Sequence, residues 1–279
     1  MNIGDYKFEI KNKTSYAISE NYFDGYFNAF YSSYIEIRDL VTKEDEILDV
    51  GCGGGLLVNY LFLKGYKIEG FDNYLYNPHT KAINKAINSK DLVINTDIQN
   101  FVSNKKYDLI FMSNVIEHLL DWENSLNHLE KYLKPNGRIV FLFPNYNFPI
   151  EFHFMIPIIL NKKITYRIFK NKINKFEKLH SRFGIWKSLN FVRPIMIKKY
   201  FKSRNYEVLV DKIYIERLVS VLVKNANQKG RNKKNYLHKI LIRIAKIFIF
   251  FKLLKIMRYA PLVFHPFVKI IVTKNNNKK

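Results

Sequence analysis

The sequence has few thiols and few long apolar runs. Its one cysteine, Cys52, cannot form an internal disulfide, which suits a reducing, cytoplasmic compartment. Within residues 236–259 the longest run without a charge, residues 247–251, is far shorter than the ~20 residues that a membrane-spanning helix needs. Residues 1–10 mix polar, acidic and apolar side chains, so we expect no secretory signal peptide.

Acidic residues are missing from the last part of the chain. Residues 217–279 carry 16 Lys and Arg but no Asp or Glu, and the whole chain has a formal net charge of +22. Residues 1–150, in contrast, have slightly more acidic than basic side chains. This asymmetry predicts an anionic partner for the C-terminal half, which could be a membrane surface, a nucleic acid or a phosphorylated substrate.

A glycine-rich turn follows a short apolar stretch near residue 50. Ile47, Leu48 and Val50 have the character of a buried parallel strand, the glycines of residues 51–55 allow close backbone approach by a ligand, and residues 56–64 have helical spacing. Leu56 stands where a dinucleotide fingerprint needs its third glycine, and no Gly-Lys-Ser/Thr follows. The turn therefore predicts neither a nicotinamide site nor a P-loop.

Two further carboxylates follow the next apolar runs. Asp72 lies 21 residues after Gly51, where a carboxylate at the end of a second parallel strand can bind ribose hydroxyls. Asp97 follows a third run and could accept a hydrogen bond from an adenine amino group. Each alone could equally be a turn or N-cap residue. Together with Asp49 and the glycines, they favour a nucleoside-containing ligand.

These segments resemble a known family. Residues 47–55 resemble motif I of class I S-adenosylmethionine-dependent methyltransferases, residues 70–72 their acidic second motif, and Asp97-Ile98 their adenine-side motif. Residues 107–118 and 133–138 resemble their fourth and fifth strands. The resemblance implies an α/β, Rossmann-like seven-stranded sheet with helices on both faces and an antiparallel last strand. It also implies S-adenosylmethionine as methyl donor. We expect the donor to contact Asp49, Gly51, Gly53, Gly55, Asp72, Asp97, Ile98 and Asn114.

We expect the chain to have three parts. Residues 1–44 form an aromatic-rich helical segment that packs on the core and could also serve as a lid. Residues 45–223 form the methyltransferase core, with an insertion at residues 144–192. Residues 224–279 form a basic, apolar extension. In it, residues 236–259 predict one interrupted interfacial helix or two short helices, or else a pair of basic helices that cap the core. The last strand could be residues 213–223 or, within the extension, residues 267–273.

Glu117-His118 has two interpretations. In ubiquinone-pathway O-methyltransferases, a similar Glu-His pair helps to hold a divalent metal together with an acid three residues earlier. Here that position is Asn114, a poorer ligand, so we expect no metal. The other interpretation is that Glu117 orients His118, which faces the cleft and acts as the base for an acceptor hydroxyl.

The insertion offers a second base. Residues 144–157 resemble a segment of some bacterial methyltransferases associated with surface-polysaccharide synthesis. Here His153, near Glu151, is either hydrogen-bonded to backbone in a structural loop or part of an acid/base pair on an acceptor lid. The segment containing His180 and Arg182 is a weaker candidate.

Two functions remain open at this point. The first is an O-methyltransferase acting on a small molecule, a sugar or a lipid-linked glycan at the inner membrane surface. The second is an RNA methyltransferase whose basic half binds phosphates. The sequence shows no RNA-binding motif and no Asn/Asp-Pro-Pro-Tyr/Phe motif for amine methylation, so the first is favoured.

Overall fold

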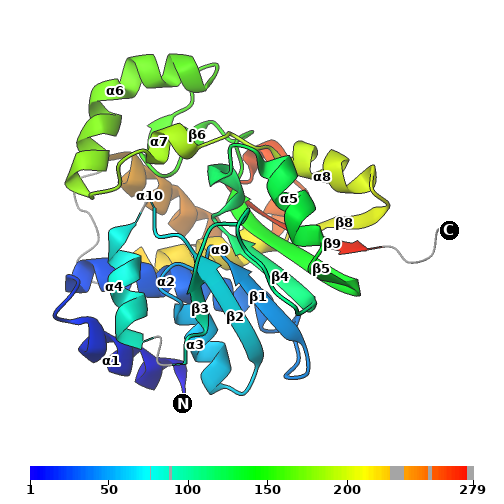
Figure 1. Ribbon diagram of the computed structural model, residues 1–279. Helices are drawn as coiled ribbons and strands as arrows, with labels where there is room; N and C mark the ends of the chain where they lie inside the picture. Colours follow the sequence, from blue (N-terminus) through cyan, green and yellow to red (C-terminus); the bar gives the residue numbers. More distant parts are fainter. Residues whose placement is uncertain (76, 88–89, 227–235, 251–252, 275–279) are drawn as a thin grey trace.

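A seven-stranded sheet with helices on both faces forms the body of the protein (Figure 1). The computed structural model describes residues 1–75, 77–87, 90–226, 236–250 and 253–274. The expected α/β, Rossmann-like fold is confirmed. The strands of the main sheet are β1 (Glu46–Val50), β2 (Lys67–Asp72), β3 (Val93–Asn95), β4 (Tyr107–Ser113), β5 (Leu133–Pro144), β8 (Tyr206–Val210) and β9 (Phe267–Lys274).

The strand order is β3-β2-β1-β4-β5-β9-β8. β1 pairs in parallel with β2 and β4, and β9 lies antiparallel between β5 and β8. Of the two candidates for the last strand, residues 267–273 are therefore correct. Residues 213–223 are wrong, because they lie in α9 (Tyr214–Ala226), where Tyr214, Ile215 and Leu218 are buried at helical spacing.

Helices cover the two faces of the sheet unequally. The core on one face includes side chains of α1 (Ile3–Thr14), α2 (Glu20–Ile37), α3 (Leu56–Leu63), α4 (Pro78–Ile87) and α9. The core on the other face includes side chains of α5 (Trp122–Glu130) and α8 (Pro194–Lys202). In β1, Ile47 belongs to the first core, and Leu48 and Val50 to the second. Burial on both faces explains why these parallel strands are almost continuously apolar.

The insertion after β5 has its own small core. It contains a two-stranded sheet of β6 (Ile150–Glu151) and β7 (Ile156–Pro157), followed by α6 (Lys162–Leu179) and α7 (Ile185–Ser188). Phe154, Trp186 and neighbouring apolar side chains pack together there. A short 3-10 helix, η1 (Ile116–His118), follows β4 and contacts α7. The insertion therefore stands beside the carboxyl end of β4, where the sequence predicts the acceptor.

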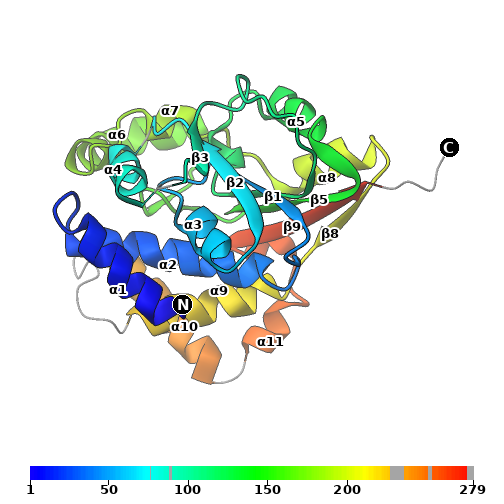
Figure 2. The same ribbon diagram turned by 60° about the horizontal axis from the view of Figure 1, so that its bottom comes forward.

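α1 and the helices α10 (Tyr236–Phe250) and α11 (Leu254–Met257) of the C-terminal extension lie on the same side of the sheet (Figure 2). α1 is anchored by Tyr6, which is fully buried and donates a hydrogen bond from its hydroxyl to the Leu56 carbonyl (2.9 Å). The extension also contains a 3-10 helix, η2 (Leu262–Phe264). α10 and α11 contact α9. Among the described residues, no helix combines the length and the apolar character that crossing a membrane requires.

Candidate functional site

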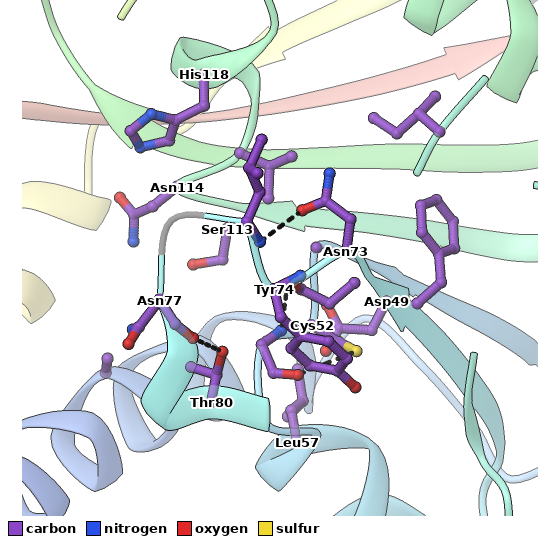
Figure 3. Close-up of a pocket in the computed structure, with 18 of the residues that line it drawn as sticks. Asp49, Cys52, Leu57, Asn73, Tyr74, Asn77, Thr80, Ser113, Asn114 and His118 are labelled. Atoms are coloured by element: carbon purple, nitrogen blue, oxygen red, sulfur yellow. Dashed lines mark hydrogen bonds between the residues drawn. The ribbon is translucent and has the colours of Figure 1, made fainter. Parts of the chain in front are cut away.

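A cavity of about 450 Å³ opens at the carboxyl ends of β1, β2 and β4. Its walls come from α2, the glycine turn, the loops after β2, β3 and β4, and the insertion. Figure 3 shows Asn114 and His118 at one end and Asp49 and Cys52 at the other. Ligands of open α/β sheets bind at this edge, because the helix N-termini and loops converge there. The residues expected at the site that line the cavity are Asp49, Gly51, Gly53, Asp72, Asp97, Ile98, Asn114, His118 and His153.

The glycine turn has no room for side chains. Gly51 and Gly53 have φ values of +64° and +58°, which other residues rarely adopt. A Cβ at Gly51 would collide with Val115, and one at Gly53 with the Tyr26 hydroxyl. That hydroxyl also accepts a hydrogen bond from the Gly54 N–H, so α2 closes directly over the turn. Gly55, also with positive φ, is the N-cap of α3.

Two carboxylates lie against this turn. Asp72 accepts hydrogen bonds from the backbone N–H groups of Gly53 (2.9 Å) and Tyr74 (2.6 Å). Burial raises the pKa of Asp72, and these two bonds partly offset that rise. Asp49 is buried, and burial together with the negative charge of Asp72 raises its pKa well above the usual range. A cationic ligand at this end of the cavity would stabilise both ionised carboxylates.

Asp97 and Ile98 line the cavity in the loop after β3. The Asp97 carboxylate accepts hydrogen bonds from the backbone N–H (2.9 Å) and side-chain amide (3.1 Å) of Asn100, so it has the turn role considered above. Ile98 is buried and packs in the core beneath. The contact of Asp97 with adenine stays a prediction.

The opposite end of the cavity holds two imidazoles. His118 Nδ1 lies 2.8 Å from Ser188 Oγ, whose own proton goes to the Ile185 carbonyl (2.8 Å). Ser188 Oγ must therefore accept from His118 Nδ1–H, which leaves the ring lone pair on Nε2. Burial and the positive charges of His153 and Arg182 lower the pKa of His118 well below its usual value. His118 is therefore a neutral imidazole at physiological pH.

His153 has a different environment. Its Nδ1 lies 2.6 Å from Glu151 Oε1, and the Glu151 carboxylate also accepts from the backbone N–H groups of His153 (3.1 Å) and Phe154 (2.9 Å). Burial lowers the pKa of His153, but its attraction and hydrogen bond to Glu151 dominate and raise it above 6.5. The rings of His118 and His153 lie edge to face, with 4.9 Å between their centroids. The insertion therefore brings the two predicted bases together.

Glu117 lies beside both rings and is fully buried. Neither carboxylate oxygen has a hydrogen-bond partner on another described residue, so the expectation that Glu117 orients His118 by a hydrogen bond is wrong, and Ser188 holds that ring instead. Burial raises the pKa of Glu117 to about 7. Ligand atoms of Glu117, His118 and His153 lie within 4.8 Å of one another, so these three side chains could together hold a metal ion. The sequence disfavours a metal because Asn114 replaces an acid, but it does not reveal that His153 joins the pair. The expectation of no metal stays a prediction.

Three residues at the site were not assigned these roles from the sequence. Tyr26 belongs to an aromatic stripe at helical spacing, so its contact with Gly54 cannot be distinguished from ordinary core packing. Ser188 carries no sequence signal for its bond to His118. Arg182, in the weaker candidate segment, lines the cavity.

Comparisons with known proteins agree with this geometry. Residues 31–212, more than half of the chain, match the model of a family described as Methyltransferase domain. An uncharacterized protein of Mycobacterium tuberculosis is 29% identical over 178 residues, which are 58% of this chain and 60% of that protein. The ubiquinone biosynthesis O-methyltransferase of Rickettsia bellii is 35% identical over 107 residues, which are 38% of this chain and 42% of that enzyme. Each match thus spans less than two thirds of the relative's length.

A solved structure shows the same fold. Phosphoethanolamine N-methyltransferase 2 of Haemonchus contortus, in complex with S-adenosyl-L-methionine, superposes with a TM-score of 0.54 at 14% identity. The superposition covers 88% of this chain and 52% of that one. The family match covers the glycine turn and the three carboxylates Asp49, Asp72 and Asp97, and these features together fit the methyl donor. The chain belongs to the class I S-adenosylmethionine-dependent methyltransferases, and S-adenosylmethionine is its cofactor.

Proposed function

We propose that this methyltransferase transfers the methyl group to a hydroxyl oxygen of a small molecule, a sugar or a lipid-linked glycan, with His153 as the base. The observation that carries the proposal is His153 on the cavity wall, bonded through Nδ1 to the buried Glu151. A carboxylate bonded to Nδ1 fixes the tautomer and the ring, and it leaves Nε2 as the nitrogen that can meet an acceptor hydroxyl. Nitrogen acceptors, in contrast, often need no such base, because an uncharged amine already has a lone pair.

The roles of the chain's own residues follow from the geometry. When bound, S-adenosylmethionine supplies a methyl group on a positively charged sulfur. Gly51, Gly53 and Asp72 would hold its methionine and ribose parts, and Asp49 would offer negative charge near the sulfonium. His153 takes the proton of the acceptor hydroxyl at Nε2, and Glu151 stabilises the resulting imidazolium. Holding donor and acceptor in one orientation can lower the barrier by ~7–11 kcal/mol in favourable cases.

His118 has a supporting role in this proposal, although the sequence ranks it as the first base. A base works best when its pKa lies near the working pH. The pKa of His118 is lowered well below 6.5, whereas that of His153 is raised above it. His118 Nε2 can instead accept a hydrogen bond from the acceptor. The Rickettsia bellii relative is named an O-methyltransferase, which supports oxygen as the acceptor atom.

The proposal includes a location at the cytoplasmic membrane surface. Its support is the C-terminal extension, where exposed cations alternate with exposed apolar side chains. Such a surface suits anionic lipid headgroups. The basic charge would also suit RNA, but none of the relatives described above is named for a nucleic-acid acceptor, and we do not propose that alternative.

The test uses a labelled methyl donor and an extract of cells that lack the gene, so that unmethylated acceptor accumulates. We expect His153→Gln and Glu151→Gln to lower the turnover of the labelled product by ~100-fold or more, with donor affinity unchanged within about twofold. His128→Gln is the matched control, because His128 bonds to the Phe101 carbonyl and does not line the cavity. Full turnover of the His153→Gln variant would show that His153 is not the base.

A further inference from the structure

Among the described residues that line the cavity, Arg182 is the only Lys or Arg. It follows the end of α6, and its backbone N–H donates to the Glu177 carbonyl (2.9 Å). The Glu177 carboxylate accepts from the backbone N–H groups of Gly184 (3.2 Å) and Trp186 (2.9 Å) at the start of α7. These bonds hold the turn between α6 and α7 and fix where Arg182 enters the cavity wall.

The guanidinium of Arg182 lies in a half-buried place without an opposite charge. In the part of the chain that the structure describes, no carboxylate lies within 4.0 Å of it. The nearby Glu151 is bonded to His153, and Glu177 is used by α7. The side chains whose titration Arg182 affects are Tyr22, His118, His153 and His180, all of them neutral or cationic. A partly buried cation in this setting is stabilised by an anionic ligand.

The two ends of the cavity therefore differ in charge. Asp49, Asp72 and Asp97 line the donor end, whereas Arg182 lines the cavity where its positive charge acts on His118 and His153. A guanidinium binds carboxylate or phosphate oxygens through two parallel hydrogen bonds, which fixes orientation as well as position. An ammonium group on the acceptor would be repelled by the same guanidinium.

We propose that the acceptor is a small molecule with an oxyanionic group, a carboxylate or a phosphate, close to the hydroxyl that is methylated, and that Arg182 binds this group. The inference rests on the proposed O-methylation and names the acceptor class. Arg182 binds the anion and His153 faces the hydroxyl, so the acceptor is held at two points. Acceptors without the anion lose one of these points and bind more weakly.

Direct binding tests this without turnover. The probes are inorganic phosphate and benzoate, titrated into protein saturated with S-adenosylhomocysteine, at constant ionic strength set by chloride. We expect wild-type protein to bind at least one probe, Arg182→Gln to bind it at least tenfold more weakly, and Arg182→Lys to fall between them. Arg193→Gln is the control, because Arg193 is exposed at the start of α8 and outside the cavity. Phosphate binding and benzoate binding distinguish the two kinds of anion.

A second arm uses the labelled methyl donor and the extract described above. The labelled product should be retained by an anion exchanger, and Arg182→Gln should raise the KM for its acceptor at least tenfold, with donor affinity and kcat changed less than about threefold. Equal probe binding by wild type and Arg182→Gln would overturn the inference. So would a tenfold loss of donor affinity in Arg182→Gln, because Arg182 would then bind the donor carboxylate. Loss of turnover in His153→Gln together with a neutral product would overturn the anionic acceptor and leave the O-methylation intact.

Discussion

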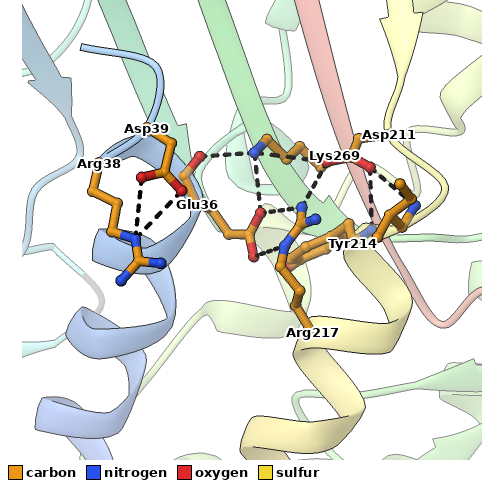
Figure 4. A network of polar contacts seen from close by, with 8 residues as sticks. Glu36, Arg38, Asp39, Asp211, Tyr214, Arg217 and Lys269 are labelled. Carbon is orange, nitrogen blue, oxygen red and sulfur yellow. Dashed lines mark hydrogen bonds and ion pairs between the residues drawn. The ribbon is translucent and has the colours of Figure 1, made fainter.

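Lys269 of β9 and Glu36 of α2 form a buried ion pair, with 3.0 Å between Nζ and Oε2, although 233 residues separate them (Figure 4). Lys269 also donates to the Glu36 carbonyl (2.7 Å). Arg217 of α9 binds the same carboxylate through two hydrogen bonds (2.8 and 2.6 Å) and reaches Asp211 (2.6 Å). This network connects α2, which forms one wall of the cavity, to β9 and α9.

Replacing Lys269 by Met should therefore destabilise the whole fold. The variant leaves Glu36 with Arg217 but removes one buried partner of its carboxylate, and breaking a buried pair costs about 3 kcal/mol at the lower end of the usual range. Urea unfolding would measure the loss. Lys67→Met is the control, since Lys67 pairs with Glu44 at an exposed site, where such pairs contribute less than ~1 kcal/mol. Equal stability of the two variants would show that the Lys269 pair contributes little.

This network also shows what the sequence could not predict. The glycine turn, the carboxylates and the parallel strands follow from local patterns, because each motif is contiguous and its chemistry depends on neighbours in sequence. Lys269, in contrast, is one Lys among many, and nothing local indicates that it is buried beside Glu36. The sequence leaves the last strand ambiguous for the same reason. Residues 213–223 are as apolar as a strand, and only packing on α2 and β9 selects a helix.

The end of the cavity that holds the two imidazoles is likewise only partly predictable from the sequence. His118 and His153 could be named from the sequence, because His118 follows the carboxyl end of a parallel strand, where ligands bind, and His153 is a polar residue among aromatics in the insertion. Their order as bases could not be derived, because it depends on which partner each Nδ1 meets. Ser188 holds one ring and Glu151 the other, and both partners reach the site through the folded insertion.

Donor binding should depend on Asp72. Asp72→Ala removes the predicted ribose ligand and also the acceptor for the Gly53 N–H, so the glycine turn loses a support. We expect affinity for S-adenosylmethionine to fall more than tenfold, which corresponds to about 1.4 kcal/mol. Calorimetry would measure this, with Asp39→Ala as the control because Asp39 is exposed and lies outside the cavity. Unchanged affinity in Asp72→Ala would rule out the ribose assignment.

The buried Glu117 should make stability fall as pH rises. Its pKa is about 7 in the folded protein against an ordinary 4.5, so between these values the folded state keeps a proton that the unfolded state has lost. The free energy of unfolding therefore decreases across this window, by about 3 kcal/mol in total. The Glu117→Gln variant lacks this pH-dependent decrease, because glutamine does not titrate. Relative to wild type, we expect the variant to gain about 3 kcal/mol between pH 4.5 and pH 8.

The measurement is urea unfolding at several pH values in the presence of a chelator, so that no divalent cation pairs with Glu117. Glu44→Gln is the control, because the Glu44 side chain is 87% exposed in the folded protein, whereas Glu117 is fully buried. Parallel stability curves for wild type and Glu117→Gln would contradict the raised pKa. A large stabilisation of wild type by added divalent cation, absent in Glu117→Gln, would instead contradict the expectation of no metal.

The C-terminal extension should bind anionic membranes. The described part of α10 and α11 presents the exposed cations Arg243, Lys246 and Lys255. Between and beside them lie the exposed apolar side chains Ile244, Ile247, Ile249, Phe250, Ile256 and Tyr259. Figure 2 shows α10 and α11 outside the layer of α1, α2 and α9, at the edge of the molecule. Each cation near an anionic leaflet contributes about 1 kcal/mol, and apolar burial adds to this.

We therefore expect cosedimentation with vesicles of anionic lipid, weakened by salt because the charge interaction is screened, and little binding to neutral vesicles. The double variant Ile247→Ser/Phe250→Ser removes exposed apolar groups from α10 and should weaken vesicle binding at least tenfold without affecting the cavity. Leu63→Ser/Val102→Ser is the matched control, because both of these side chains are also exposed but lie away from the extension. If the two double variants bind anionic vesicles as strongly as wild type, α10 is not the membrane contact. If the intact protein does not bind anionic vesicles but binds RNA with a steep dependence on salt, the basic surface binds a nucleic acid instead.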